Sequence, residues 1–264
     1  MDLTKIQSVI GLDLAANTAG MCEVEVSTGK VLRWACIVGT KKFAGMKLPD
    51  CGKAYLLPTQ IISGNSQKAE SRDNYLARRR CFIETVIYSF IAESNQGYNL
   101  VCLEGYAYAS QSRGLYDMIE LSGCVRSELW SIGIPLRIYD PRNIKFWATS
   151  KGNAKKLHMV LEASEGDLSQ VPQGIPQEFF QKGSKFLDPI TIGEKQYTHD
   201  YTGPATDVID AMWIAQMGRM ELRLKRKELS CDNLPSHKTK AFISEAKDEK
   251  ITFFDKPFIC RNVD

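Results

Sequence analysis

Three apolar runs in this chain carry acidic residues at or near their ends, and this pattern constrains the fold more than any other feature. Asp13 ends the run VIGLD, Glu104 ends LVCLE, and Asp207 and Asp210 lie in TDVIDAMWIA. A buried apolar run holds its acid rigidly at the end of a strand or helix. Four carboxylates gathered at one point would repel one another, by roughly 4 kcal/mol for two charges 4 Å apart at an effective dielectric of 20. Divalent metal ions relieve such repulsion, and carboxylate-held metal pairs hydrolyse phosphodiester bonds.

Length and composition indicate a folded protein with an ordinary core. The chain has 264 residues, which suits one enlarged domain or two small ones. Hydrophobic residues make up 44% and charged residues 25%, so wholesale disorder is excluded. The net charge of +3 says little by itself. Local clusters of Lys and Arg say more about a polyanionic partner.

The cysteines predict a reducing compartment. There are eight of them and none forms a CxxC pair, while only three histidines are available, so a zinc site is not expected. We expect buried, reduced cysteines. The N-terminus has no signal-peptide pattern, and no apolar stretch reaches the ~18 residues of a membrane span. The expectation is a soluble cytoplasmic protein with no membrane contact.

The order of apolar patterns predicts an α/β fold. Strands are expected at 7–14, 20–27, 30–38, 99–104 and 135–139. Helices are expected at 67–94, 114–131, after Asp140, at 153–163 and at 205–228. Segments 39–66 and 165–203 lack periodicity and are expected to be loops or insertions, and 229–264 a polar tail. This order describes a mixed five-stranded sheet, three strands antiparallel and then two parallel, with helices on both faces.

The four acids can meet within such a fold. If the strands that carry Asp13 and Glu104 are neighbours, their carboxylates lie together above the sheet. Asp207 and Asp210 are three residues apart on a helix and share one face. Structural alternatives stay open: Asp207 would suit the positive end of the helix as a cap, and Asp210 would suit a salt bridge.

A family resemblance rests on four segments that occur in chain order. They are VIGLDLAANTAG, LVCLEGYAYAS, PLRIYDPRNIKFWATSKGNAKKLHMV and ATDVIDAMWIA. Together they resemble the RuvC family of Holliday-junction resolvases, within the ribonuclease H-like superfamily. The resemblance implies a nuclease domain over 1–228 with insertions near 39–66 and 165–203, followed by the extension 229–264. It departs from the family in those insertions and in the loop LAANTAG, which is not the usual glycine-rich form.

The same resemblance implies the roles of the acids. Asp13, Glu104, Asp207 and Asp210 would be catalytic and would bind two Mg²⁺ ions, with Mn²⁺ as a possible substitute. Carboxylate oxygens favour these ions over zinc. The family also has a lysine-rich patch, which Lys145, Lys151, Gly152, Ala154 and Lys155 match here. A homodimer is implied because two symmetric nicks resolve a symmetric junction.

Basic and aromatic residues supply candidate DNA contacts. A lysine such as Lys151 near the scissile phosphate would stabilise developing charge. A polybasic helix face contacts phosphates, and tyrosines after the second acid would stack on an unpaired base. The candidate DNA-contacting residues are Arg78, Arg79, Arg80, Tyr106, Tyr108, Lys145, Lys155 and Lys156. The structural alternatives are a solvated helix face for the arginines and simple packing for the tyrosines.

These observations predict a metal-dependent, structure-specific DNA endonuclease that acts on branched DNA, with four-way junctions as the expected substrate. Two alternatives belong to other classes. GLDLAANTAG also resembles the first phosphate loop of actin-like ATPases and sugar kinases, but 264 residues are few for their two lobes. A DNA-binding scaffold that keeps the acids without turnover is the other alternative.

Overall fold

The structure is a computed structural model that describes residues 2–15, 18–38, 43, 46–56, 72–94, 98–105, 113–165, 172, 174–192, 194–245 and 256–260. For 72–78, 98, 113–118 and 165 the structure describes the backbone only. Tyr106 and Tyr108 lie outside the described residues, as does the apolar patch at 251–254.

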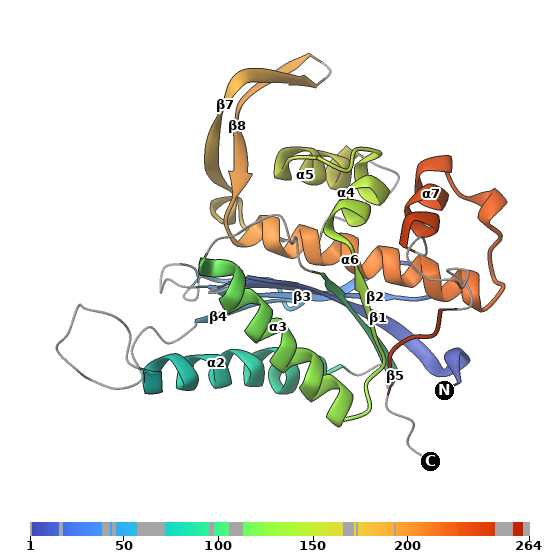
Figure 1. The fold of residues 1–264 in the computed structure, drawn as a ribbon. Helices are drawn as coiled ribbons and strands as arrows, with labels where there is room; N and C mark the ends of the chain where they lie inside the picture. The colour runs from blue at the N-terminus through green and yellow to red at the C-terminus, as the bar shows by residue number, and fades with distance from the viewer. Residues whose placement is uncertain are drawn as a thin grey trace.

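A six-stranded mixed sheet forms the centre of the fold (Figure 1). Its strands are β1 (Ile6–Leu14), β2 (Ala19–Glu25), β3 (Val31–Val38), β4 (Gly52–Leu56), β5 (Tyr98–Glu104) and β6 (Leu136–Tyr139). They lie in the spatial order β4-β3-β2-β1-β5-β6. β1, β2 and β3 are antiparallel neighbours, and β5 and β6 run parallel to β1. The predicted mixed sheet is confirmed, but the count of five strands is wrong because β4 joins the edge parallel to β3.

Helices cover both faces of the sheet, as predicted (Figure 1). They are α2 (Arg72–Val86), the π-helical turn η2 (Ile87–Ile91), α3 (Arg113–Ser131), α4 (Pro141–Thr149), α5 (Lys156–Glu165), α6 (Pro204–Lys225) and α7 (Ser236–Glu245). Short 3-10 turns are η1 (Leu3–Lys5), η3 (Gln177–Phe179) and η4 (Cys231–Asn233). α6 lies against β1 and β2 with α4, α5 and α7 beyond it, while α2, η2 and α3 cover the opposite face.

The alternation of buried side chains in β1 explains this two-sided covering. Val9 packs into the core beneath α6, whereas Ile10 and Leu12 pack into the core beneath α2 and α3. All three side chains are fully buried. Because successive strand residues point to opposite faces, a strand that is apolar at nearly every position must be covered on both sides.

Segment 165–203 differs from the expected loop. It contains a two-stranded hairpin, β7 (Gln181–Ile192) and β8 (Lys195–Thr202), which stands out from the body in Figure 1. Most of its side chains are exposed or half-buried, so the segment has no clear apolar period to read. Similarly, β4 lies inside the expected loop 39–66.

The C-terminal extension returns to the body of the fold. α7 packs against α4, Phe258 is buried, and Ile259 forms an antiparallel bridge to Leu136 on the edge strand β6. The boundary at residue 228 stays a prediction. No described helix has the length and apolar character needed to cross a membrane. All eight cysteines are free, as expected; Cys22, Cys36 and Cys102 are buried, and the other five are not.

Candidate functional site

Three of the four predicted acids line one pocket. Asp13 lies near the end of β1, Glu104 ends β5, and Asp210 lies in the second turn of α6. β1 and β5 are parallel neighbours with Leu12 opposite Leu103, so the two following acids emerge at the same edge. The pocket measures about 130 Å³, and its lining also includes Lys145, Lys156, Pro141, Ile144, Met159 and Ile214. The predicted meeting of these side chains is present, and their chemical roles stay predictions.

Asp207 joins this group through a lysine. The Nζ atom of Lys156 lies 2.9 Å from Asp207 Oδ1 and 3.3 Å from Asp210 Oδ2, and it also donates to Thr206 Oγ1 at 3.2 Å. Asp207 itself lines a second pocket of about 330 Å³ at the start of α6. The salt bridge that the sequence left open for Asp210 is therefore real, and Lys156 also pairs with Asp207.

Two glycines allow α6 to bring its aspartates close to the sheet. Gly20 on β2 lies directly opposite Asp13, and a Cβ atom there would lie 1.9 Å from the backbone oxygen of Asp207. A Cβ atom on Gly11 would lie 1.9 Å from the backbone oxygen of Ala211. Glycine inside a strand often marks such a close backbone approach. Both glycines interrupt apolar strands, and this pattern could have predicted the close approach of another backbone segment.

The pocket holds more negative than positive charge. Burial, and then the neighbouring carboxylates with Glu104 first, raise the pKa of Asp13 well above its usual range. Burial and the charge of Asp210 raise the pKa of Glu104 to about 7. Burial also raises the pKa of Asp210, against the opposing effect of Lys156. Burial opposes the charge of Lys156, but Asp210, Asp207 and Asp13 outweigh it and raise the pKa of this lysine. The three acids that face the pocket thus compete for too little positive charge.

The chemistry of the pocket fits a hard divalent cation. Its donors are carboxylate oxygens, which suit Mg²⁺ and Mn²⁺, and a bound cation would favour the ionised forms that burial disfavours. The ligand geometry is not preformed: within the described ranges, no three His, Cys, Asp or Glu side chains are already arranged to hold an ion. Asp207 and Asp210 pair with Lys156 instead.

No family model and no curated protein sequence matches this chain. Two solved structures of Thermus thermophilus RuvC are similar to it in fold. One is RuvC at 16% sequence identity and the other is RuvC in complex with a Holliday junction substrate at 14%. Each likeness has a TM-score of 0.42 and covers 83% of this chain and 96% of the other. At this degree of similarity, neither structure bears on what this chain binds or cleaves.

The predicted basic residues divide between the pocket and distant surfaces. Lys145 lines the pocket, while the side chains of Lys151 and Lys155 are exposed in and beside the α4–α5 connection. Arg78, Arg79 and Arg80 lie on α2, which covers the opposite face of the sheet from α6. Arg80 forms an exposed ion pair with Glu84. The structure does not bring the three arginines to the acids, and their DNA contact stays a prediction.

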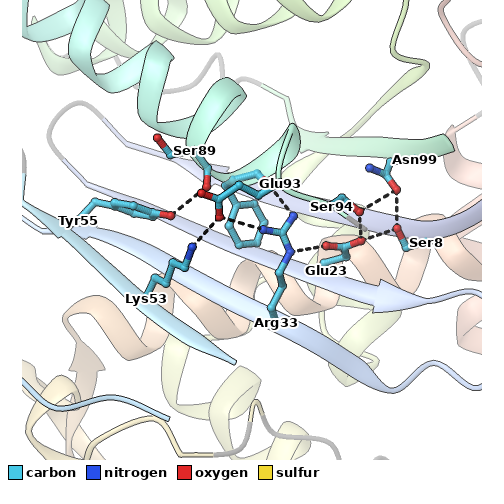
Figure 2. A network of polar contacts seen from close by, with 10 residues as sticks. Ser8, Glu23, Arg33, Lys53, Tyr55, Ser89, Glu93, Ser94 and Asn99 are labelled. Carbon is cyan, nitrogen blue, oxygen red and sulfur yellow. Dashed lines mark hydrogen bonds and ion pairs between the residues drawn. The ribbon is translucent and has the colours of Figure 1, made fainter. Parts of the chain in front are cut away.

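A second buried polar cluster lies at the other end of the same strands, near the start of β1 and β5 (Figure 2). Glu23 on β2 is 2% exposed and accepts hydrogen bonds from Ser8 Oγ at 2.6 Å and from Ser94 Oγ. Arg33 Nε lies 2.6 Å from Glu23 Oε2, and this guanidinium also donates to the backbone oxygen of Phe90 in η2. This cluster joins residues far apart in the chain, so no local pattern in the sequence predicts it.

Proposed function

We propose that this chain is a metal-dependent nuclease that hydrolyses phosphodiester bonds in branched DNA. The observation that carries the proposal is the meeting of Asp13, Glu104 and Asp210 around one pocket. These acids come from two strands and a helix that are far apart in sequence, and the pocket gathers three of them with two lysines, Lys145 and Lys156. A fold gains nothing in stability from gathering like charges, so a cation ligand is the natural reason for the arrangement.

Each residue around the pocket has a proposed task. Asp13, Glu104 and Asp210 would hold the metal from within the pocket, and Asp207 would complete the set from the preceding turn of α6. When bound, two Mg²⁺ ions would supply an activated water and stabilise the leaving oxygen. Lys145 lines the same pocket, where its ammonium would face a phosphate placed at the acids. The exposed Lys151 would approach the DNA backbone next to the cleaved bond.

The choice of branched DNA rests on the sequence resemblance. The four segments that resemble RuvC resolvases include all four acids and the lysine patch. We infer a four-way junction as the substrate and a homodimer as the active form, since paired nicks need two sites. The hairpin β7–β8 and the strand β4 lie in the two segments that depart from that family, so substrate preference is where this chain would differ.

A cleavage assay with the Asp13→Asn variant tests the proposal. Asn keeps the shape of Asp13 but loses its charge, so binding of a labelled four-way junction should persist while Mg²⁺-dependent nicking falls by at least ~10²-fold. Flap, duplex and RNA–DNA hybrid substrates are assayed in parallel, with and without chelator. Asp232→Asn, the same change at an exposed position, is the matched control. Cleavage by Asp13→Asn at the rate of the wild-type protein refutes the assignment.

The cleavage assay, together with DNA-binding and nucleotide-binding titrations, decides between the proposal and its alternatives. An actin-like or sugar-kinase-like protein would bind a nucleotide with one-to-one stoichiometry and show no affinity for DNA. An inactive scaffold would bind junctions regardless of metal and would nick none of the substrates with any divalent ion. Products from one branched substrate alone favour the proposed nuclease.

A further inference from the structure

Lys156 occupies an unusual place for a cation. It is the first residue of α5, where the helix dipole disfavours positive charge. Its side chain is only 39% exposed, so it is also partly removed from water. The ammonium stays there because Asp207 and Asp210 hold it at 2.9 and 3.3 Å. Its ammonium thus partly neutralises the negative charges of Asp207 and Asp210.

A metal ion and this ammonium would compete for the negative charge of the same two carboxylates. Asp207 and Asp210 are two of the four proposed metal ligands, and Lys156 lies within ion-pair distance of both. A divalent cation at these oxygens would repel the ammonium at short range. The lysine has a flexible four-carbon stem and a path to solvent, so it is able to move away while the aspartates stay on α6.

We propose that Lys156 is a resident counter-cation, which neutralises Asp207 and Asp210 until a divalent metal displaces it and which then turns to a DNA phosphate. The inference rests on the proposed function, because it assumes that the four acids bind metal. It gives Lys156 a second task besides DNA contact: it weakens metal binding by free protein. It also couples metal to DNA, since metal binding releases a cation at the mouth of the pocket.

The direct test measures metal affinity rather than cleavage. Mn²⁺ is titrated into the wild-type protein and into Lys156→Met, and binding is followed by calorimetry or by the electron paramagnetic resonance signal of free Mn²⁺. Removal of the competing ammonium should tighten Mn²⁺ binding at least ~10-fold, which corresponds to about 1.4 kcal/mol. Lys155→Met removes the same charge from the neighbouring exposed position and should change the affinity less than ~3-fold. Lys156→Arg keeps the charge and should stay close to wild type.

The outcomes separate this inference from the proposed function. Equal or weaker Mn²⁺ binding by Lys156→Met overturns the inference and leaves the metal site intact. Mn²⁺ binding by neither wild type nor Lys156→Met overturns both. A gain of affinity in Lys155→Met as large as in Lys156→Met also overturns the inference, because it would show a general charge effect.

A second measurement uses the wild-type protein and does not depend on whether the variant folds. Lysines are acetylated briefly with acetic anhydride, and the modified positions are quantified by mass spectrometry. Lys156 should react several-fold faster after Mn²⁺ is added, because its ammonium leaves the aspartates, while Lys155 should react equally in both conditions. Unchanged or slower labelling of Lys156 with Mn²⁺ overturns the inference.

Discussion

The two ends of strands β1 and β5 differ in how far their buried carboxylates are compensated by hydrogen-bond donors and cations. At one end, Glu23 is surrounded by donors: Arg33 pairs with it and two serine hydroxyls point at it (Figure 2). At the other end, four carboxylates lie near Lys156, which pairs with Asp207 and Asp210, and burial raises the pKa values of Asp13, Glu104 and Asp210. A buried charge that has its partners is typical of a residue with a structural role. A cluster with a surplus of one charge is typical of a site that binds a ligand of opposite charge. The contrast identifies the pocket without reference to any relative.

A compensated pair should be costly to break, and the clearest case is Arg137 with Glu221. Both side chains are almost fully buried, Tyr139 donates to the same carboxylate, and Arg137 also donates to the backbone of the C-terminal segment at Lys256 and Pro257. Arg137→Met should lower the free energy of unfolding by about 3–5 kcal/mol, since Glu221 is left buried without its main partner. Urea unfolding monitored by circular dichroism measures the loss.

The matched control for this prediction is an arginine in an exposed pair. Arg80 and Glu84 form an ion pair four residues apart on the surface of α2, with the Arg80 side chain 79% exposed. Arg80→Met should leave stability nearly unchanged, because solvent screens such pairs. Equal losses of unfolding free energy in Arg137→Met and Arg80→Met would contradict the comparison. Burial would then not determine how much an ion pair contributes to stability.

The geometry of the pocket depends on the close approach of α6 to the sheet at Gly20. Gly20→Ala places a methyl group against the backbone of Asp207 and must push α6 away from the sheet. We expect a loss of about 2–3 kcal/mol in unfolding free energy, together with weakened Mn²⁺ binding because Asp207 and Asp210 move with the helix. Unfolding curves and a metal titration measure the two effects separately.

Gly123 provides the control for that substitution. It lies within α3, and a Cβ atom there would meet nothing within 4 Å. Gly123→Ala should therefore stabilise the protein by about 0.5–1 kcal/mol, since alanine favours a helix over glycine. Intact metal binding and stability in Gly20→Ala would show that α6 tolerates displacement and that the glycine does not set the geometry of the pocket.

The acid end of this comparison was readable in the sequence. Asp13 and Glu104 lie at the ends of apolar runs long enough to be recognised as strands, and the structure fulfils the condition that those strands are neighbours. The three-residue spacing of Asp207 and Asp210 fixed their shared helix face. The apolar period of a strand and the residue spacing on a helix are local patterns, so they can be recognised in the sequence without knowledge of tertiary contacts.

Features that depend on distant contacts were not readable. The pairing of Lys156 with both aspartates requires α5 to lie over the start of α6, which no local pattern encodes. The hairpin at 181–202 exposes most of its side chains and so lacks an apolar period, and β4 is a five-residue edge strand with two well-exposed positions. The buried pair of Glu23 and Arg33 was not predicted, because charged residues on expected strands usually face solvent.

The last prediction uses pH to separate the two ends of the sheet. Burial and Asp210 raise the pKa of Glu104 from its ordinary 4.5 to about 7, so the folded protein without metal holds this proton more tightly than the unfolded chain does. The folded state then binds more protons at Glu104 between these values, so this group makes stability fall as pH rises through that window, against a smaller rise from His158 and His237, whose pKa values burial lowers. The raised pKa of Asp13 acts in the same direction. We expect a loss of about 1–2 kcal/mol between pH 5 and pH 7 in chelator, measured by urea unfolding at each pH.

Two additions make the pH test specific to the pocket. Saturating Mg²⁺ should abolish the fall, because a bound cation favours the ionised carboxylates, and Glu104→Gln should reduce it because Gln carries no titrating proton. Arg80→Met, far from the acids on α2, should keep the full fall. A pH dependence of stability that is the same in Glu104→Gln as in the wild-type protein would mean that the carboxylates of the pocket are already compensated. The pocket would then resemble the Glu23 end of the sheet, and the argument for a cation site would be lost.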